Sequence, residues 1–431
     1  MRKSSKKRPY RAFHLGQFKW DALFERVKDR RIVFSVDIAK EAMVAGVMDE
    51  DESVLKTVRW SHPLETDLLL EFLEGLRENA TDVAVAMEPS GVYGDALRWQ
   101  LHEASFEVFR VSPKKSHDMS EIYDGVPSSH DGKSAAIIGV LHLQGASDPW
   151  PPESEQNREL TAALQLVRAF GKQFRQNLSR LEALTARHWP ELALSLELSS
   201  ATALELLAAF GGPASVVRSS DEARALMKRI GRSKLASKKI DAVLLSAEGS
   251  TGVPLIPEED RLVRVLAAET RRQQQELRQA QRRVGELSTE EGSTRELAPV
   301  VGKTTAAVIV AGVGDPLDFA SPQALTKAAG LNLREHSSGK QKGGLHITKR
   351  GSGEARMYLW MAALRLIQSD PVIKAWYAKK VKRQGGQAKP KALVAVMRKL
   401  MLGLWHVARG KPFDSTKLFD VRRLNLAGDP R

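Results

Sequence analysis

The chain contains no cysteine among its 431 residues. Disulfide bonds, zinc sites with thiolate ligands and cysteine nucleophiles are therefore excluded. No uninterrupted apolar run approaches the roughly 18 residues that a membrane span needs. The basic N-terminal residues, MRKSSKKRPYRAF, are not followed by the apolar segment of a secretory signal. We therefore expect a cytoplasmic protein that has no membrane partner.

Acidic residues are too few to balance the basic ones. The chain has 66 Lys+Arg against 52 Asp+Glu, which gives a formal net charge of +14. The excess is concentrated between Arg334 and Lys411, where 18 basic and 3 acidic residues leave a net +15. A basic surface can serve solubility alone, but a concentrated patch fits contacts with nucleic-acid phosphates better.

The first third of the chain alternates between β-type and helical patterns. Residues 1–11 have the composition of a disordered basic arm, and we place the whole arm at 1–30. Over residues 31–150 the predicted order is β-β-β-α-β-α-β-α, which is typical of an RNase H-like domain. The expected strands lie at 31–38, 42–48, 54–60, 82–88 and 106–111, the expected helices at 63–79, 92–104 and 132–144, and a loop at 113–131.

The rest of the chain shows no β-type alternation over its helical stretches, so the predicted fold class is α/β followed by α. After a linker at 148–153, apolar residues recur at helical steps along 160–184 and again along 262–287. This spacing predicts a region at 155–292 in which two long helices pair as a coiled coil. A small helical unit is expected between them at 199–248. A mostly helical domain is expected at 293–431, with an exposed loop at 328–353 and basic helices at 353–370, 371–383 and 389–409.

Three acidic residues occupy the ends of predicted elements. Asp37 ends the first strand, Glu88 ends the strand at 82–88, and Asp131 precedes the helix at 132–144. In an RNase H-like sheet these positions meet at one edge, where clustered carboxylates call for a cation, and hard oxygen ligands favour Mg²⁺ or Mn²⁺. A single acid at a strand end is more often a cap or a solvated turn residue. The prediction of a catalytic metal site for phosphoryl transfer therefore rests on the three together.

The basic loop expected at 328–353, which we call the serine loop, contains the second candidate site. A serine hydroxyl such as that of Ser337 or Ser338 is a poor nucleophile until a neighbour or a metal lowers its proton affinity. Ser-Ser-Gly is also common in loops without any function. The segment GVGDP at 312–316 is not followed by GK[ST], so nucleotide binding is not indicated. The loop also holds the candidate nucleic-acid contacts Lys340, Lys342, Lys349 and Arg350.

Five stretches, spread over most of residues 31–370, carry a resemblance to one known family. They are FSVDIAK, VAMEPSGVYGDALRWQL, FRVSPKKSHDM, HDGKSAAIIG and AAGLNLREHSSGKQKGGLHITKRGSGEAR. In this order they resemble motifs of the DEDD transposases of the IS110 type of insertion sequence. That family includes the Piv-type invertases and the bridge-RNA-guided recombinases, and its first domain is of the RuvC type.

The resemblance implies a role for each matched acid. Asp37, Glu88 and Asp131 take the positions of the family's first three acids, whereas the fourth position holds Ser134. This departure leaves three alternatives open. Three carboxylates suffice, a nearby acid such as Asp124 substitutes, or the metal site is weakened.

The resemblance also implies a chemistry and partners. The family's nucleophilic serine falls on Ser338, with Ser337 as the adjacent alternative. We expect metal-assisted attack on a DNA phosphodiester, a covalent 5′-phosphoserine intermediate and strand exchange between donor and target DNA. A structured guide RNA and homodimers that assemble into tetramers are further expected. Two other functions stay open: a RuvC-like nuclease that hydrolyses DNA without a covalent step, and a non-catalytic nucleic-acid-binding protein.

Overall fold

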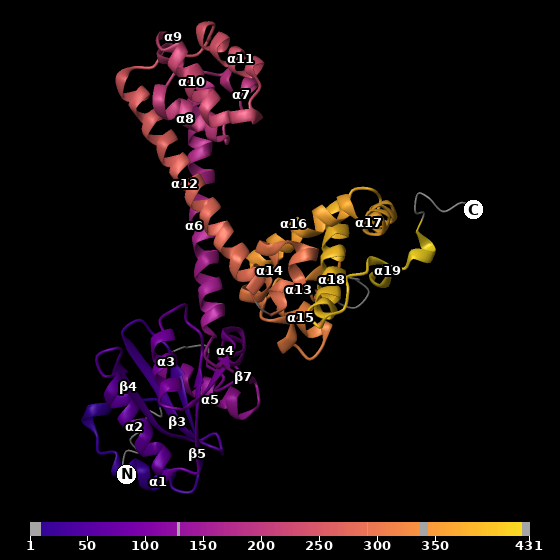
Figure 1. Cartoon of the computed structure of the whole chain (residues 1–431). Helices are drawn as coiled ribbons and strands as arrows, with labels where there is room; N and C mark the ends of the chain where they lie inside the picture. Colours follow the sequence, from indigo (N-terminus) through magenta and orange to yellow (C-terminus); the bar gives the residue numbers. More distant parts are fainter. Residues whose placement is uncertain (1–9, 127–129, 291, 336–343, 425–431) are drawn as a thin grey trace. The chain divides into compact units, whose positions relative to one another are not determined.

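The computed structural model describes residues 10–126, 130–290, 292–335 and 344–424 (Figure 1). The chain divides into two compact units, Met1–Glu153 and Ser154–Arg431. The first unit is built on a mixed sheet, and the second is mostly helical. Across these described ranges, none of the helices combines the length and apolar character that crossing a lipid bilayer requires.

The first unit contains a seven-stranded sheet with the order β1-β4-β3-β2-β5-β6-β7. Strand β3 runs antiparallel to its two neighbours, β2 and β4, whereas β5 and β6 continue the sheet parallel to β2. At the edges, β1 pairs parallel with β4, and β7 pairs antiparallel with β6. The strands are β1 Phe13–His14, β2 Arg31–Asp37, β3 Ala42–Asp49, β4 Val54–Ser61, β5 Asp82–Met87, β6 Glu107–Val111 and β7 Ser147–Pro149.

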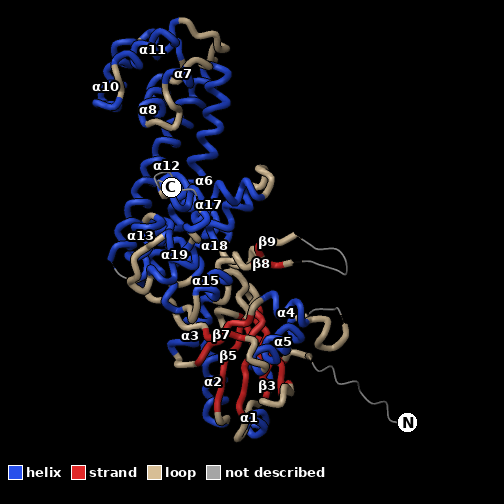
Figure 2. The backbone as a smooth tube through the Cα atoms, turned by 90° about the vertical axis from the view of Figure 1, so that its right-hand side faces the viewer, coloured by secondary structure: helices blue, strands red, loops and turns tan. Residues whose placement is uncertain are grey.

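Helices cover both faces of this sheet, and for that reason the central strands read as continuous apolar runs (Figure 2). Side chains of β2 alternate between the two layers. Phe34 packs in the larger core cluster with residues of α1, α2 and α3, whereas Val33 packs with Ile137 and Ile138 of α5. The helices of this unit are α1 Asp21–Val27, α2 Thr66–Asn79, α3 Asp95–Glu103, α4 Pro113–Met119 and α5 Asp131–Leu143.

The predicted element order of residues 31–144 is confirmed, but three expectations about the connecting segments are wrong. The arm predicted at 1–30 is folded from residue 13 onward, because Leu15, Leu23 and Val27 are buried in the core through η1 (Leu15–Gln17) and α1. The predicted loop at 113–131 contains α4, which begins with a proline whose φ suits a first helical turn. The predicted linker at 148–153 begins inside the edge strand β7.

Two antiparallel helices, α6 (Glu155–His188) and α12 (Pro257–Glu290), form the long element of the second unit. Leu164 near the start of α6 shares a buried cluster with Val284 near the end of α12, and Leu181 shares another with Val263. The prediction of two long paired amphipathic helices is confirmed. The small helical unit between them is confirmed as well, as α7 Leu192–Ser195, α8 Ala201–Phe210, α9 Pro213–Arg218, α10 Ser220–Gly231 and α11 Ser237–Glu248.

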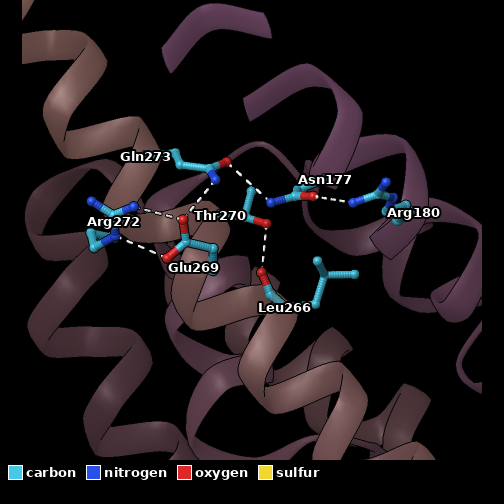
Figure 3. A network of polar contacts seen from close by, with 7 residues as sticks. All are labelled: Asn177, Arg180, Leu266, Glu269, Thr270, Arg272 and Gln273. Atoms are coloured by element: carbon cyan, nitrogen blue, oxygen red, sulfur yellow. Dashed lines mark hydrogen bonds and ion pairs between the residues drawn. The ribbon is translucent and has the colours of Figure 1, made fainter. Parts of the chain in front are cut away.

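A polar contact interrupts the apolar seam between α6 and α12 (Figure 3). The Asn177 amide donates to Gln273 Oε1 at 3.2 Å, and Gln273 Nε2 donates to Glu269 at 2.7 Å. Asn177 is only 8% exposed and Gln273 only 4%. Hydrogen bonds from Arg272 hold the pKa of Glu269 below its usual range. Since a buried amide needs a partner, this contact favours one register of the two helices.

The C-terminal part of the second unit packs around α18, whose buried residues include Val396, Leu400 and Leu404. The three predicted basic helices are confirmed as α16, α17 and α18. A small two-stranded sheet and the helix α15 were not predicted, because segments of two to seven residues are too short to show a period. The elements are α13 Ser293–Val301, α14 Lys303–Val313, η3 Pro316–Asp318, α15 Pro322–Ala328, β8 Leu333–Arg334, β9 His346–Ile347, α16 Gly353–Ser369, α17 Pro371–Arg383, α18 Lys389–Val407, α19 Ser415–Leu418 and η4 Val421–Arg423.

Gln273→Ala should lower the free energy of unfolding by about 1–3 kcal/mol, because it leaves the buried Asn177 amide without its partner. Gln275→Ala is the matched control, since Gln275 is exposed on the same helix. Urea unfolding of both variants measures the difference. Equal losses in the two variants would show that the polar contact adds nothing to the helix pair.

Candidate active site

Two of the predicted acids lie at one edge of the sheet because their strands are parallel neighbours. Val36 pairs with Met87, Asp37 is the last residue of β2, and Glu88 directly follows β5. Both acidic residues are half-buried. Both line a cavity of about 190 Å³. The structure therefore brings Asp37 and Glu88 together, as their positions at the strand ends predict.

Helix α5 brings two further residues towards Asp37. Its first residue is Asp131, and the preceding His130 caps the helix by accepting the N–H of Lys133 at its Nδ1 atom. Ser134, one turn further on, lines the same cavity as Asp37. Asp131 is exposed and does not line the cavity.

The Asp37 carboxyl reports the electrostatics of this site. Burial, followed by the negative charges of Asp131 and Glu88, raises its pKa to about 6, and the hydrogen bond from Ser134 acts in the opposite direction. The three acids are therefore close enough to repel one another. Within the described part of the chain, however, no three His, Asp or Glu side chains converge closely enough to hold a metal ion as they stand.

Asp124, the acid proposed as a substitute for the fourth carboxylate, is engaged elsewhere. It accepts a hydrogen bond of 2.6 Å from Lys133, whose side chain is only 1% exposed and also donates to the Val126 carbonyl at 2.6 Å. The hydrogen bond from Lys133 holds the pKa of Asp124 below its usual range. Asp124 neither lines the cavity nor acts on the pKa of Asp37.

Helix α4 contributes residues that the sequence analysis missed. Ser116, His117 and Ser120 line the cavity together with Asp37 and Glu88. His117 is exposed. The segment FRVSPKKSHDM was recognised as a motif, but its helix has seven residues and a single buried one, Ser116. A helix of this kind has no apolar period that would place His117 beside the carboxylates.

The serine loop is described only at its two ends. Ser337, Ser338, Lys340 and Lys342 lie outside the described residues. At the described ends, β8 and β9 pair Leu333 with Ile347 and Arg334 with His346. The remaining two candidates for nucleic-acid contact, Lys349 and Arg350, are exposed.

Glycines let the chain pack closely at the described base of this loop. A Cβ atom at Gly330 would lie 2.0 Å from the Arg350 carbonyl oxygen, and one at Gly351 would lie 2.1 Å from that of Ala328. Both glycines have positive φ, 70° and 98°. The Lys349 N–H donates to the Gly330 carbonyl at 2.9 Å. These contacts hold Lys349 and Arg350 at a defined place on the surface of the second unit.

Asp37→Asn should stabilise the protein at neutral pH. In the folded protein the pKa of Asp37 is about 6, above the usual value of 3.8. The folded state therefore binds the proton of this carboxyl more tightly than the unfolded state does. As a result, the free energy of unfolding decreases as the pH rises from about 4 to about 6. The shift corresponds to roughly 3 kcal/mol at most, and to about 1–2 kcal/mol after solvent screening of a partly buried group. Thermal unfolding of the wild type and the variant at both ends of this window measures the gain.

The exposed Asp51→Asn is the control, since it changes the net charge equally within the same unit. We expect Asp37→Asn to match the wild type near pH 4 and to exceed it above pH 6. If the Asp37→Asn variant is no more stable than the wild type above pH 6, then the ionised Asp37 carboxylate does not destabilise the folded protein.

Known protein families match both parts of the chain. A model of IS110-type DEDD transposases, described as "Transposase", matches residues 34–190, which include Asp37, Glu88 and Asp131. A second model, "Transposase IS116/IS110/IS902 family", matches residues 296–378, which include the serine loop. A Streptomyces coelicolor protein named "Insertion element IS110 uncharacterized 43.6 kDa protein" is 23% identical over 309 residues, or 70% of this chain and 75% of that protein. The resemblance drawn from the motifs is thereby confirmed, and the chain belongs to the IS110-type family of DEDD transposases.

Proposed function

We propose that this transposase cleaves and exchanges DNA strands with two cooperating sites, the acids Asp37, Glu88 and Asp131 and the serine loop that carries Ser338. The observation that carries the proposal is the raised pKa of Asp37 at a sheet edge that it shares with two other acids. Ionised carboxylates in such a place are stabilised by a cation, and phosphoryl transfer is the chemistry that uses one. The two family models, one over each site, support the pairing.

Asp37, Glu88 and Asp131 would hold the divalent cation on which a DEDD family depends, and we propose Mg²⁺ or Mn²⁺. The donor chemistry fits, because all three supply carboxylate oxygens and two of them line one cavity. Binding would require the exposed Asp131 side chain to turn towards the other two acids, since the three do not converge as they stand. Ser134 would orient the Asp37 carboxylate through their hydrogen bond. A bound cation would supply positive charge that stabilises a developing negative charge on phosphate oxygens.

We further propose that the first unit is an RNase H-like domain of the RuvC type. Three features support this. The strands β2, β3 and β4 form an antiparallel meander, β5 and β6 extend it parallel to β2, and α5 packs on β2 with Asp131 at its first position. In this arrangement the acids come from the ends of two neighbouring strands and from the start of one helix.

In the proposed reaction the Ser338 hydroxyl oxygen attacks the phosphorus of a DNA phosphodiester. A bond forms between the serine oxygen and the 5′-phosphate, the bond to the 3′ oxygen breaks, and the serine proton ends on the released 3′-hydroxyl. Lys349 and Arg350 are exposed beside this loop and would attract the phosphate. Strand exchange follows when another 3′-hydroxyl attacks the phosphoserine and reverses the bond changes.

We also propose a structured guide RNA and an assembly of homodimers into tetramers through a coiled coil of α6 and α12. The net +15 of residues 334–411 is more charge than a few DNA contacts need, and it supports a second nucleic acid. The helix pair leaves apolar residues exposed, such as Leu166 on α6 and Leu262 and Val265 on α12. In the proposed assembly a second protomer would cover these side chains.

Ser338→Ala should abolish the covalent protein–DNA adduct and lower strand exchange by several orders of magnitude, as expected when a nucleophile is removed. DNA binding should persist, because the basic residues are unchanged. Denaturing electrophoresis of the protein with end-labelled DNA and Mg²⁺ measures the adduct. Ser337→Ala is the matched control and should still form it.

Other outcomes of this experiment would separate the alternatives. An adduct that persists in Ser338→Ala but not in Ser337→Ala would move the nucleophile by one residue. Cleavage without an adduct in the wild type would replace the serine mechanism with water-dependent hydrolysis. Cleavage that persists in Asp37→Asn would remove the acidic site from the reaction.

A further inference from the structure

The end of α10, the start of α11 and the turn between them carry a concentrated positive charge that the proposed function does not use. We call it the tip patch. No Asp or Glu occurs between residues 228 and 239. Residues 189–256 as a whole hold 8 basic and 7 acidic residues, so the charge is segregated rather than in excess. The patch consists of Lys228, Arg229, Arg232, Lys234, Lys238 and Lys239, all of them exposed.

The tip patch is not used for ion pairs within the protein. Among the described residues, none of its six cations lies within ion-pairing distance of a carboxylate. The neighbouring Arg224, in contrast, pairs with Asp241 at 2.5 Å. Six exposed cations on one short turn repel one another, and an anionic partner would remove this repulsion.

The helix dipole favours Lys228 and Arg229 in the last turn of α10, but the local structure does not explain three of the other cations. Lys238 and Lys239 occupy the first turn of α11, where the helix dipole disfavours positive charge. That turn holds no acidic residue, and Ala236 offers no side-chain cap. Arg232 has a φ of 50°, a conformation that suits glycine better. All three residues are therefore unfavourable for the local fold, and an anionic partner would offset the cost of their charge.

The side-chain types of the tip patch indicate which class of partner it binds. The other exposed residues of the turn are Ser233, Ala236 and Ser237, and none is large and apolar. A membrane anchor or a protein interface would need apolar anchors at this place. Cations and hydroxyl groups are the side chains that contact phosphates. We propose that the tip patch binds the phosphate backbone of duplex DNA, the substrate class of a transposase, as a contact separate from residues 334–411.

The length of α6 and α12 determines which DNA can use this contact. Each helix has 34 residues, or about 50 Å. The small helical unit packs on Leu181 and Val263 at one end of the pair, and α14 packs on Leu160 and Val284 at the other. DNA that reached from the C-terminal helices to the tip patch would span on the order of 15 base pairs. The patch would therefore hold DNA that flanks the reacting strands.

The test replaces three of the cations in the full-length protein by Lys234→Gln, Lys238→Gln and Lys239→Gln. The matched control is Lys172→Gln with Arg278→Gln and Arg282→Gln, which removes the same charge from exposed positions on α6 and α12. Fluorescence anisotropy with a duplex of roughly 40 base pairs, at about 50 to 200 mM salt, gives the salt dependence of binding.

A plot of the logarithm of the binding constant against the logarithm of the salt concentration has a negative slope. In the tip variant this slope should become less steep by up to about 2.7, or about 0.9 for each lost phosphate contact, whereas the control should keep the wild-type slope. Thermal unfolding should show no loss of stability in the tip variant. An unchanged slope, or an equal loss in the control, would overturn the proposal. A loss seen with structured RNA but not with duplex DNA would also overturn it. Because binding is measured without cleavage, the result does not depend on the chemistry of Ser338.

Discussion

Electrostatic repulsion at the edge of the sheet is the constraint on which the proposed chemistry depends. Asp37 is the last residue of a strand that is buried on both faces, so its carboxyl is held in a poorly hydrated place beside Glu88 and near the charge of Asp131. Only the hydrogen bond from Ser134 favours the ionised form there. A fold that concentrates negative charge in this way is at its most stable when a cation is present.

Two other buried polar groups, on Lys133 and Asn177, already have partners. The Lys133 ammonium is held by Asp124 and a backbone carbonyl, and the Asn177 amide is held by Gln273. These contacts fix a loop and a helix register. The contrast with Asp37 is electrostatic. The charge of Lys133 is balanced inside the chain by Asp124, whereas Asp37 has two other acids near it.

The sequence was most informative where burial imposes a pattern. The strand at 82–88 is a continuous apolar run that ends in Glu88, and long apolar periods identified α6 and α12. The acids could be found because each stands at the end of such an element. Short segments carry no period, so α4 with His117 and the strands β8 and β9 were missed.

Two further features depend on contacts that no single stretch of sequence encodes. Ser134 looked like the loss of an acid, and in the structure it lines one cavity with Asp37 and lowers the pKa of that carboxyl. Asp124 looked like a substitute acid, and the structure pairs it with the buried Lys133. The tip patch escaped notice for another reason. Its helical unit is nearly neutral as a whole, and only the structure shows that the six cations are exposed and take no part in ion pairs among the described residues.

We propose that Asp37, Glu88 and Asp131 together bind a divalent metal ion. Replacing that ion with Fe²⁺ in the presence of ascorbate and peroxide would cut the backbone next to the metal, and mass spectrometry would locate the cuts. We expect cuts close to residues 37, 88 and 131 that excess Mg²⁺ suppresses. Cuts that cluster elsewhere, or none above the background of metal-free protein, would contradict it.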